Sequence, residues 1–282
     1  MKAARFYQAN EPLRLEDIPT PTISRDEALV EVKACGICHS DLHIIEGKIP
    51  VPYLPLVLGH EISGKLTKIE SKTEQFSEGD RVLVSGLTSC GCCRYCGLGQ
   101  DNICPSKLEL GIHVDGGYAE FVKVPVSSLF KIPREISYDE AAILTDAIAT
   151  PYHAVRVAGI GLGDLVAIYG VGGLGMNAVQ LAHLSGARVI AIDVLDTKLK
   201  LAEEFGAEET INARTTDPVS KIMELTGSEG VDVAMEFVGV GKTFEQAIAS
   251  IRRGGKVVLG GVGTDVVGLN MREMTAKEAV IY

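Results

Sequence analysis

Residues 165–175 read LVAIYGVGGLG, an apolar run followed directly by Gly170, Gly172 and Gly175 in G-x-G-x-x-G spacing. The apolar run predicts a buried strand, and the residues from 174 onward predict a helix. Glycines at such a turn let the backbone approach a pyrophosphate closely, and the helix N-terminus supplies amide donors to it. The stretch therefore predicts a dinucleotide-binding turn that also includes Gly173 and Leu174.

An acidic residue ends the next apolar run along the chain. Residues 188–192 are followed by Asp193, eighteen residues after Gly175, where a carboxylate can accept both hydroxyls of a ribose. Because this carboxylate would repel a 2′-phosphate, NAD is favoured over NADP, with Lys198 as a further contact to the ribose or phosphate. The alternative interpretation is that the glycines serve only to pack the helix on the sheet.

The second half of the chain alternates between strand and helix patterns. This rhythm predicts a doubly wound parallel sheet with helices on both faces. The short run at 210–212 would be the third strand, and the sixth would begin at 278–281, so we expect a sixth strand truncated by the end of the chain. The expected strands are 165–169, 188–192, 231–237 and 256–259, and the expected helices are 174–184, 197–205, 219–225 and 243–251.

The first half has a different pattern. Short β-type runs at 28–33, 81–84 and 119–124 are separated by Pro and Gly clusters such as IPVPYLP at 49–55. This pattern predicts an irregular β lobe. We therefore expect two domains, 1–150 and 151–282.

Composition sets outer bounds on function. The chain has 282 residues, of which 46% are hydrophobic, and this length allows two domains with separate cores. A formal net charge of −10 argues against nucleic acid as a partner, and no apolar stretch has the length of a membrane span. The first residues, MKAARFYQAN, do not resemble an export signal, so we expect a cytoplasmic protein.

Four cysteines follow the spacing Cys-x2-Cys-x2-Cys-x7-Cys. Thiolates at this spacing can converge on one tetrahedral zinc and close it to substrate, which predicts a structural metal site. The alternatives are disulfides or free thiols, but the total of seven cysteines is odd and no export signal is evident. Cys92 offers a second register, and Cys35 is interpreted as a small buried side chain. The four predicted ligands are Cys90, Cys93, Cys96 and Cys104.

A second group of metal-binding residue types lies upstream. Residues 35–43, CGICHSDLH, are followed by Gly-His-Glu at 59–61. A catalytic zinc needs three protein ligands and an open position, and Cys38 and His60 are the first two candidates. Asp146 is the third, because a carboxylate in an apolar run is costly to bury without a cation. Structural interpretations remain open: Cys38 as core filler, His60 as a turn residue and Asp146 as a helix N-cap.

Taken in order, CGICHSD, GHE, the four-cysteine loop and GVGGLG with its downstream acid resemble the zinc-dependent alcohol dehydrogenases of the medium-chain dehydrogenase/reductase superfamily. The resemblance covers essentially the whole chain. It implies a GroES-like catalytic domain at 1–150 and an NAD-binding Rossmann domain at 151–282. It also implies two zinc ions per chain, one structural and one catalytic, and an aspartate ligand at Asp146, where some members of the family have Asp instead of Cys.

The same resemblance implies an activity and residue roles. The expected reaction interconverts an alcohol with an aldehyde or ketone by hydride transfer with NAD(H), while zinc polarises the oxygen. Ser40 would take up the alcohol proton and His43 would pass it to solvent. Glu61 would lie beside the metal, and Asp41 would orient His60.

Further expectations concern the cofactor and the substrate. His39 matches a position near the cofactor pyrophosphate, and Thr150 matches a threonine that packs on the nicotinamide. Gly86 falls where relatives often carry a bulky side chain, which predicts a roomy pocket for secondary or aromatic alcohols. A polyol substrate remains an alternative.

The family sequence continues for several dozen residues beyond the position of Tyr282. Two functions of different class are therefore expected as alternatives: an active dehydrogenase, or a truncated and catalytically impaired homologue that binds zinc, with or without NAD, as a binding or regulatory protein. The resemblance implies a homo-oligomer, and the shortened C-terminus would weaken or alter its contacts.

Overall fold

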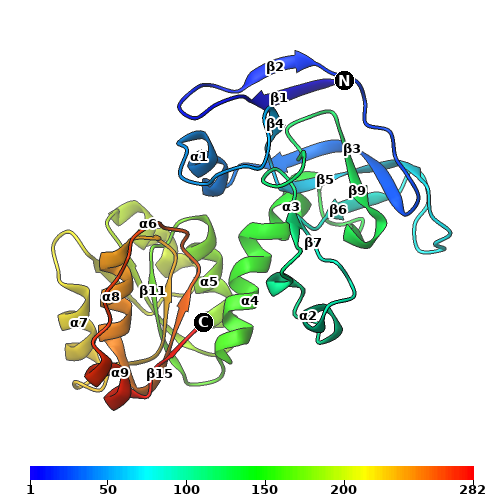
Figure 1. Cartoon of the computed structure of the whole chain (residues 1–282). Helices are drawn as coiled ribbons and strands as arrows, with labels where there is room; N and C mark the ends of the chain where they lie inside the picture. The colour runs from blue at the N-terminus through cyan, green and yellow to red at the C-terminus, as the bar shows by residue number, and fades with distance from the viewer. The chain divides into compact units, whose positions relative to one another are not determined.

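The computed structural model describes all 282 residues, which form two compact units, Met1–Asp146 and Ala147–Tyr282. Figure 1 follows the chain from the N-terminus in blue to the C-terminus in red. No helix has both the length and the apolar composition needed to cross a bilayer.

The first unit is built mainly from antiparallel strands. Its largest sheet has five strands in the order β10-β6-β5-β3-β9, beside a three-stranded sheet, β2-β1-β4, and a two-stranded one, β7-β8. The strands are β1 Lys2–Phe6, β2 Arg14–Asp17, β3 Glu27–Gly36, β4 Leu56–Val57, β5 Glu61–Ile69, β6 Arg81–Val84, β7 Leu87–Thr88, β8 Leu108–Glu109, β9 Phe121–Pro125 and β10 Leu129–Lys131.

Short helices connect these strands. They include α1 His39–Ile45, α2 Arg94–Gly97, the 3-10 turns Asp101–Ile103 and Val126–Ser128, α3 Tyr138–Ile143 and the single π-helical turn η3 Leu144–Ile148. The core of the unit follows the period of two expected of half-buried strands. Its buried residues include Ala28 and Val30 on β3, Val82 and Val84 on β6, and Val122 and Val124 on β9.

The second unit contains one parallel sheet of six strands in the order β13-β12-β11-β14-β15-β16. This order confirms the predicted doubly wound fold. The strands are β11 Leu165–Tyr169, β12 Arg188–Asp193, β13 Glu209–Asn212, β14 Val231–Glu236, β15 Ile251–Leu259 and β16 Val280–Ile281. The helices are α4 Ala149–Ala158, α5 Gly173–Leu184, α6 Asp196–Glu204, α7 Pro218–Leu225, α8 Gly241–Ser250 and α9 Met271–Lys277.

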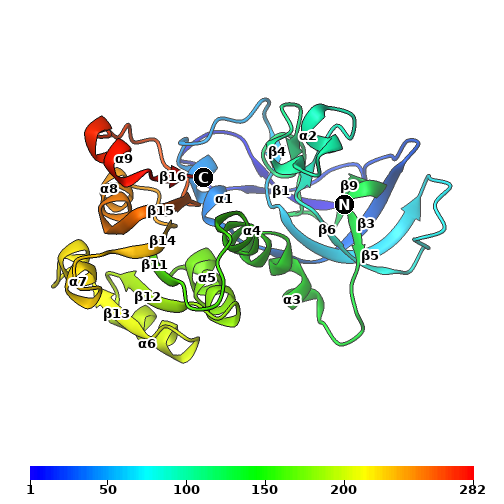
Figure 2. The same ribbon diagram turned by 90° about the horizontal axis from the view of Figure 1, so that it is seen from below.

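Both faces of this sheet are covered, as Figures 1 and 2 show for α5 and α8 on opposite sides of β11. Val166 and Ile168 of β11 belong to the core beneath α4, α5 and α6. Ala167 and Tyr169 of the same strand belong to the core beneath α7 and α8. Because successive side chains of a strand point to opposite faces, a strand buried on both sides reads as a continuous apolar run.

Strand β15 begins five residues earlier than the run at 256–259 predicts. Ile251 pairs with Val231, and the register then shifts so that Lys256 pairs with Val233. Gly254, with φ +69, lies inside this irregular stretch. Because polar residues interrupt the apolar run here, a prediction based on continuous hydrophobicity misses the first part of the strand.

Candidate metal and cofactor sites

Four side chains from three separate segments converge in the first unit. Cys38 precedes α1, His60 and Glu61 lie at the start of β5, and Asp146 lies in η3. Their potential ligand atoms all lie within 4.8 Å of one another. The Asp146 Oδ2 atom is 3.2 Å from Cys38 Sγ and 3.5 Å from His60 Nε2. The structure thus brings the three predicted donors together, and Glu61 with them.

The spacing of these donor atoms fits a zinc ion. Bonds of about 2.0–2.3 Å in tetrahedral arrangement separate a sulfur, nitrogen or oxygen ligand from its neighbour by about 3.4–3.6 Å. The two measured distances, 3.2 and 3.5 Å, lie close to that range. Three donors of mixed chemistry also leave a fourth position for another ligand, the arrangement typical of catalytic zinc.

One buried carboxylate holds two of the donor segments. Cys38 is the N-cap of α1, and its backbone N–H donates to Asp41 Oδ2 at 3.0 Å. The other carboxylate oxygen accepts from the Gly59 N–H at 3.3 Å and lies 3.7 Å from His60 Nδ1. The Tyr118 hydroxyl donates to Asp41 Oδ2 at 2.8 Å. Asp41 therefore joins the helix cap to the loop that carries the histidine.

Tyr118 was not among the predicted site residues. The residue is 77 positions from Asp41, and no local pattern connects the two. The paired glycines of the GGY segment at 116–118 were the available signal, because they indicate a close backbone approach. In the structure a Cβ on Gly116 would lie 2.1 Å from the Gly59 carbonyl oxygen, and the Gly117 N–H donates to that oxygen at 2.8 Å.

Clustered negative charge shapes the electrostatics of the group. Burial alone would lower the pKa of His60, but hydrogen bonds to Asp146 and Cys38 and the charge of Asp41 raise it to about 11. Burial, together with the charge of Asp146, raises the pKa of Glu61 to about 7. The His60 shift and the contribution of Asp146 to the Glu61 shift indicate an excess of negative charge, which a divalent cation would neutralise.

Helix α1 carries the predicted proton-transfer residues. The Ser40 hydroxyl lies 3.6 Å from Cys38 Sγ, beside the metal group. His43, one turn further along the helix, has a buried Nδ1 without a hydrogen-bond partner, 3.8 Å from Glu46 Oε2. The His39 ring contacts the His43 ring edge-on at 4.7 Å between centroids. Residues three apart share one face of a helix, so Ser40 and His43 lie in line.

The structure shows why position 86 is a glycine, which the sequence did not reveal. A Cβ atom at this position would lie 2.9 Å from the His60 carbonyl oxygen and 3.3 Å from its Cβ. The absence of a side chain therefore allows close packing behind His60. This contact gives Gly86 a packing role behind His60, and the roomy substrate pocket stays a prediction.

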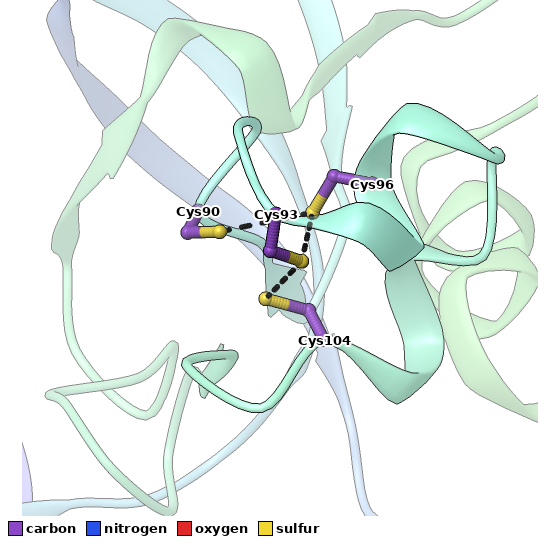
Figure 3. A group of neighbouring side chains, drawn as sticks. All are labelled: Cys90, Cys93, Cys96 and Cys104. Carbon is purple, nitrogen blue, oxygen red and sulfur yellow. Dashed lines mark hydrogen bonds between the residues drawn. The ribbon is translucent and has the colours of Figure 1, made fainter.

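The four predicted cysteines of the downstream loop also converge, as Figure 3 shows. The Cys93 and Cys96 sulfurs are 3.5 Å apart, while the Cys90–Cys96 and Cys93–Cys104 distances are both 3.9 Å. A tetrahedral tetrathiolate zinc with bonds of about 2.3 Å has sulfurs about 3.8 Å apart. Backbone N–H groups of the next residues lower the pKa of Cys90 to about 6, which favours its thiolate. The geometry fits a closed zinc site.

The predicted dinucleotide turn lies in the second unit, between β11 and α5. Gly170 has φ +85, and Gly172 is the N-cap of α5, so Gly173 and Leu174 begin the helix. A Cβ on Gly175 would lie 1.9 Å from the Gly170 carbonyl oxygen, which makes glycine necessary there. The turn therefore presents the backbone N–H groups of a helix N-terminus, as an anion site requires.

Asp193 lies beside this turn at the end of β12. Its Oδ2 accepts from the Val171 N–H at 3.0 Å, and its Oδ1 accepts from the N–H groups of Val194 and Leu195 at 2.8 and 3.1 Å. Lys198 Nζ is 3.7 Å from the carboxylate. Three backbone donors hold the acid next to the glycines. Thr150, the remaining predicted cofactor contact, is the second residue of α4.

Comparison with known proteins identifies relatives of both units. Residues 24–134 match the alcohol dehydrogenase GroES-like domain, and residues 173–282 match the zinc-binding dehydrogenase family. An alcohol dehydrogenase of Geobacillus stearothermophilus is 41% identical over 264 residues, which is 93% of this chain and 77% of the relative.

Two solved structures share the fold. The alcohol dehydrogenase of Aeropyrum pernix matches with a TM-score of 0.93 and 38% identity, over 100% of this chain and 84% of the other. The acetophenone reductase of Geotrichum candidum, solved in complex with NAD, matches with a TM-score of 0.90 and 34% identity, over 100% and 81%. The chain therefore belongs to the zinc-dependent alcohol dehydrogenases of the medium-chain dehydrogenase/reductase superfamily.

Proposed function

We propose that this chain interconverts an alcohol with an aldehyde or ketone by hydride transfer with NAD(H), and that Cys38, His60 and Asp146 hold its catalytic zinc. The observation that carries the proposal is the convergence of a thiol, an imidazole and a carboxylate from three distant segments at zinc-ligand spacing. Zinc bound there would supply Lewis-acid polarisation of the substrate oxygen. Residues 1–150 would form the catalytic domain and residues 151–282 the NAD-binding domain.

The residues of α1 would move the proton that alcohol oxidation releases. The Ser40 hydroxyl can accept a proton on its oxygen while it gives up its own, which suits it to the start of a relay. His43 would carry the proton onward, since its Nδ1 has no competing hydrogen bond. Glu61 would act at the edge of the metal group as a carboxylate that exchanges with water there.

The second unit would hold the cofactor. The pyrophosphate would bind the turn from Gly170 to Gly175, with Gly172, Gly173 and Leu174 contributing backbone. Asp193 would accept the adenosine ribose hydroxyls, which favours NAD because a 2′-phosphate would meet a carboxylate. Lys198 would make a second contact with the ribose or phosphate. His39 would lie near the pyrophosphate and Thr150 against the nicotinamide.

A second zinc would stabilise the loop of Cys90, Cys93, Cys96 and Cys104 without taking part in the reaction. A relative that is named for reducing acetophenone supports secondary and aromatic alcohols as the substrate class. The protein would act in the cytoplasm on small molecules. Strand β16 is an edge strand with half-exposed side chains, which supports a homo-oligomer.

Metal analysis and turnover with an alcohol panel test the proposal. The wild-type protein should contain two zinc ions per chain and reduce NAD with secondary alcohols. Asp146→Ala should keep only one zinc and lose about 100-fold or more in kcat/KM, because a ligand is gone. Asp139→Ala, an exposed carboxylate on α3, is the matched control and should behave as wild type. Full zinc content and turnover in Asp146→Ala would refute the ligand assignment.

A further inference from the structure

Cys92 is the one cysteine of the downstream loop that lies outside the four-thiol group. Its sulfur is 3.8 Å from Cys90 Sγ, and both residues are exposed. We propose that Cys92 is an oxidation site, at which a hydroperoxide converts Cys90 and Cys92 into a disulfide and so withdraws one ligand from the structural zinc. This inference rests on the zinc site proposed above.

The local geometry allows the two sulfurs to meet. A disulfide requires about 2.05 Å between sulfurs, so the pair must close by about 1.8 Å. The intervening Gly91 has φ +72, and no atom lies within 4 Å of the position of its missing Cβ. Residues 90–93 lie between β7 and α2, outside any helix or strand. An exposed loop with a glycine hinge can make this movement without disturbing a packed core.

Cys92 also differs from the other thiols in its availability. The four cysteines shown in Figure 3 would have their sulfur lone pairs engaged by the metal, whereas that of Cys92 is free to attack an oxidant. Cys35, the other thiol outside the two metal groups, is partly buried, and this burial is the main cause that raises its pKa to about 12. Among the thiols that are not ligands, Cys92 is therefore the accessible one.

The proposed reaction balances as a two-electron oxidation. The Cys92 sulfur attacks the hydroperoxide, the O–O bond breaks, and the thiol proton leaves with the departing oxygen as water, or as an alcohol when the peroxide is organic. The Cys90 thiolate then displaces hydroxide from the Cys92 sulfenic acid, forming the S–S bond. The two sulfurs lose two electrons in total, and the hydroperoxide gains them.

The consequence is an opened metal site. With Cys90 in a disulfide, the zinc would keep only three thiolates, Cys93, Cys96 and Cys104, and a structural site depends on four. The loop would release its zinc to a competing chelator, and a dithiol reductant would restore it. Zinc retention by this loop would thus report exposure to hydroperoxide.

The test uses the full-length zinc-loaded protein and hydrogen peroxide. Zinc release to a chromophoric chelator is followed with time, and oxidised cysteines are identified by alkylation before and after reduction, followed by mass spectrometry. The wild-type protein should release one zinc as Cys90 and Cys92 become oxidised, and dithiothreitol should reverse the change. Cys92→Ser should release zinc roughly tenfold more slowly. Cys35→Ala, the control, should match wild type.

Several outcomes would overturn the inference. Equal release rates in Cys92→Ser and wild type would do so, as would oxidation mapped to Cys93 and Cys96 while Cys92 stays reduced. Zinc content before oxidation distinguishes a missing structural zinc site from an inactive Cys92. If the untreated protein holds no zinc at this loop, the structural site and the inference fail together. If it holds zinc normally and one of the two contrary results is found, only the proposed role of Cys92 fails.

Discussion

The Gly86→Ala substitution tests how tightly the catalytic zinc site is packed. The new methyl group would lie 2.9 Å from the His60 carbonyl oxygen, whereas ordinary contacts begin at 3.4 Å. The His60 backbone must therefore move by about 0.5 Å, since the atom in the way is backbone and cannot rotate aside. Alanine itself fits the local conformation, because Gly86 does not have a positive φ.

The displacement sets the expected magnitude. Zinc–ligand distances vary by only about 0.2 Å between good sites, so a shift of about 0.5 Å in one ligand is large. Overpacking of this kind costs about 1–3 kcal/mol, and 1.4 kcal/mol corresponds to a factor of ten. We expect zinc affinity at the catalytic site to fall about 10–100-fold and kcat/KM for alcohol oxidation to fall with it.

Competition with a chelator, followed by metal content and by cobalt substitution spectra, measures this effect. Gly97→Ala is the matched control in the same unit, because no atom lies within 4 Å of the corresponding Cβ position. That variant should change unfolding free energy by less than about 0.5 kcal/mol and leave the catalytic metal in place. Catalytic zinc affinity within twofold of wild type in Gly86→Ala would refute the packing argument.

Four further outcomes are expected. Zinc uptake at the catalytic site should release at least one proton per ion near pH 8, because every ligand must be deprotonated to bind and His60 has a pKa of about 11 without the metal. Calorimetry in buffers of different ionisation enthalpy measures this release, and zero release would contradict the expectation. Because folding raises the pKa of His60, the metal-free protein should lose stability as pH rises from 6.5 towards 11. Denaturant titrations at several pH values measure the free energy of unfolding, and a rise in that free energy over this range would contradict the expectation. Tyr118→Phe, which removes a donor to Asp41, should lower zinc affinity about tenfold in chelator competition, and an unchanged affinity would remove the hydroxyl from the positioning network. Asp193→Ser should raise KM for NAD about tenfold and improve kcat/KM with NADP, whereas a constant NAD to NADP preference would argue against a ribose contact.

The sequence predicted the second unit almost completely, for a physical reason. Strands such as β11 and β12 are buried on both faces, so their apolar runs stand out, and the glycine spacing marks the turn between β11 and α5. Strand β15 was predicted only in part, because its first half carries exposed Arg252 and Arg253 and a register shift.

The metal group was only partly predictable. Cys38 and His60 lie in recognisable motifs, and Asp146 was a candidate as a carboxylate in an apolar run. The sequence could not show that Asp146 lies in a π-helical turn or that Tyr118 donates to Asp41, because both depend on contacts across the fold. The packing role of Gly86 was missed for the same reason: only the three-dimensional structure reveals the His60 carbonyl oxygen that excludes a side chain.

The Asp41 carboxylate has a consequence for the order of events in maturation. Its bonds to the Cys38 and Gly59 N–H groups and to the Tyr118 hydroxyl involve protein groups alone, so two zinc donors are set in place when the chain folds. The loop from Cys90 to Cys104 has only short helical turns, and among its four ligands only Cys104 is buried. In the proposed holoprotein, the catalytic ion would thus bind to donors that folding has already positioned, whereas the structural ion would take part in folding the loop around it.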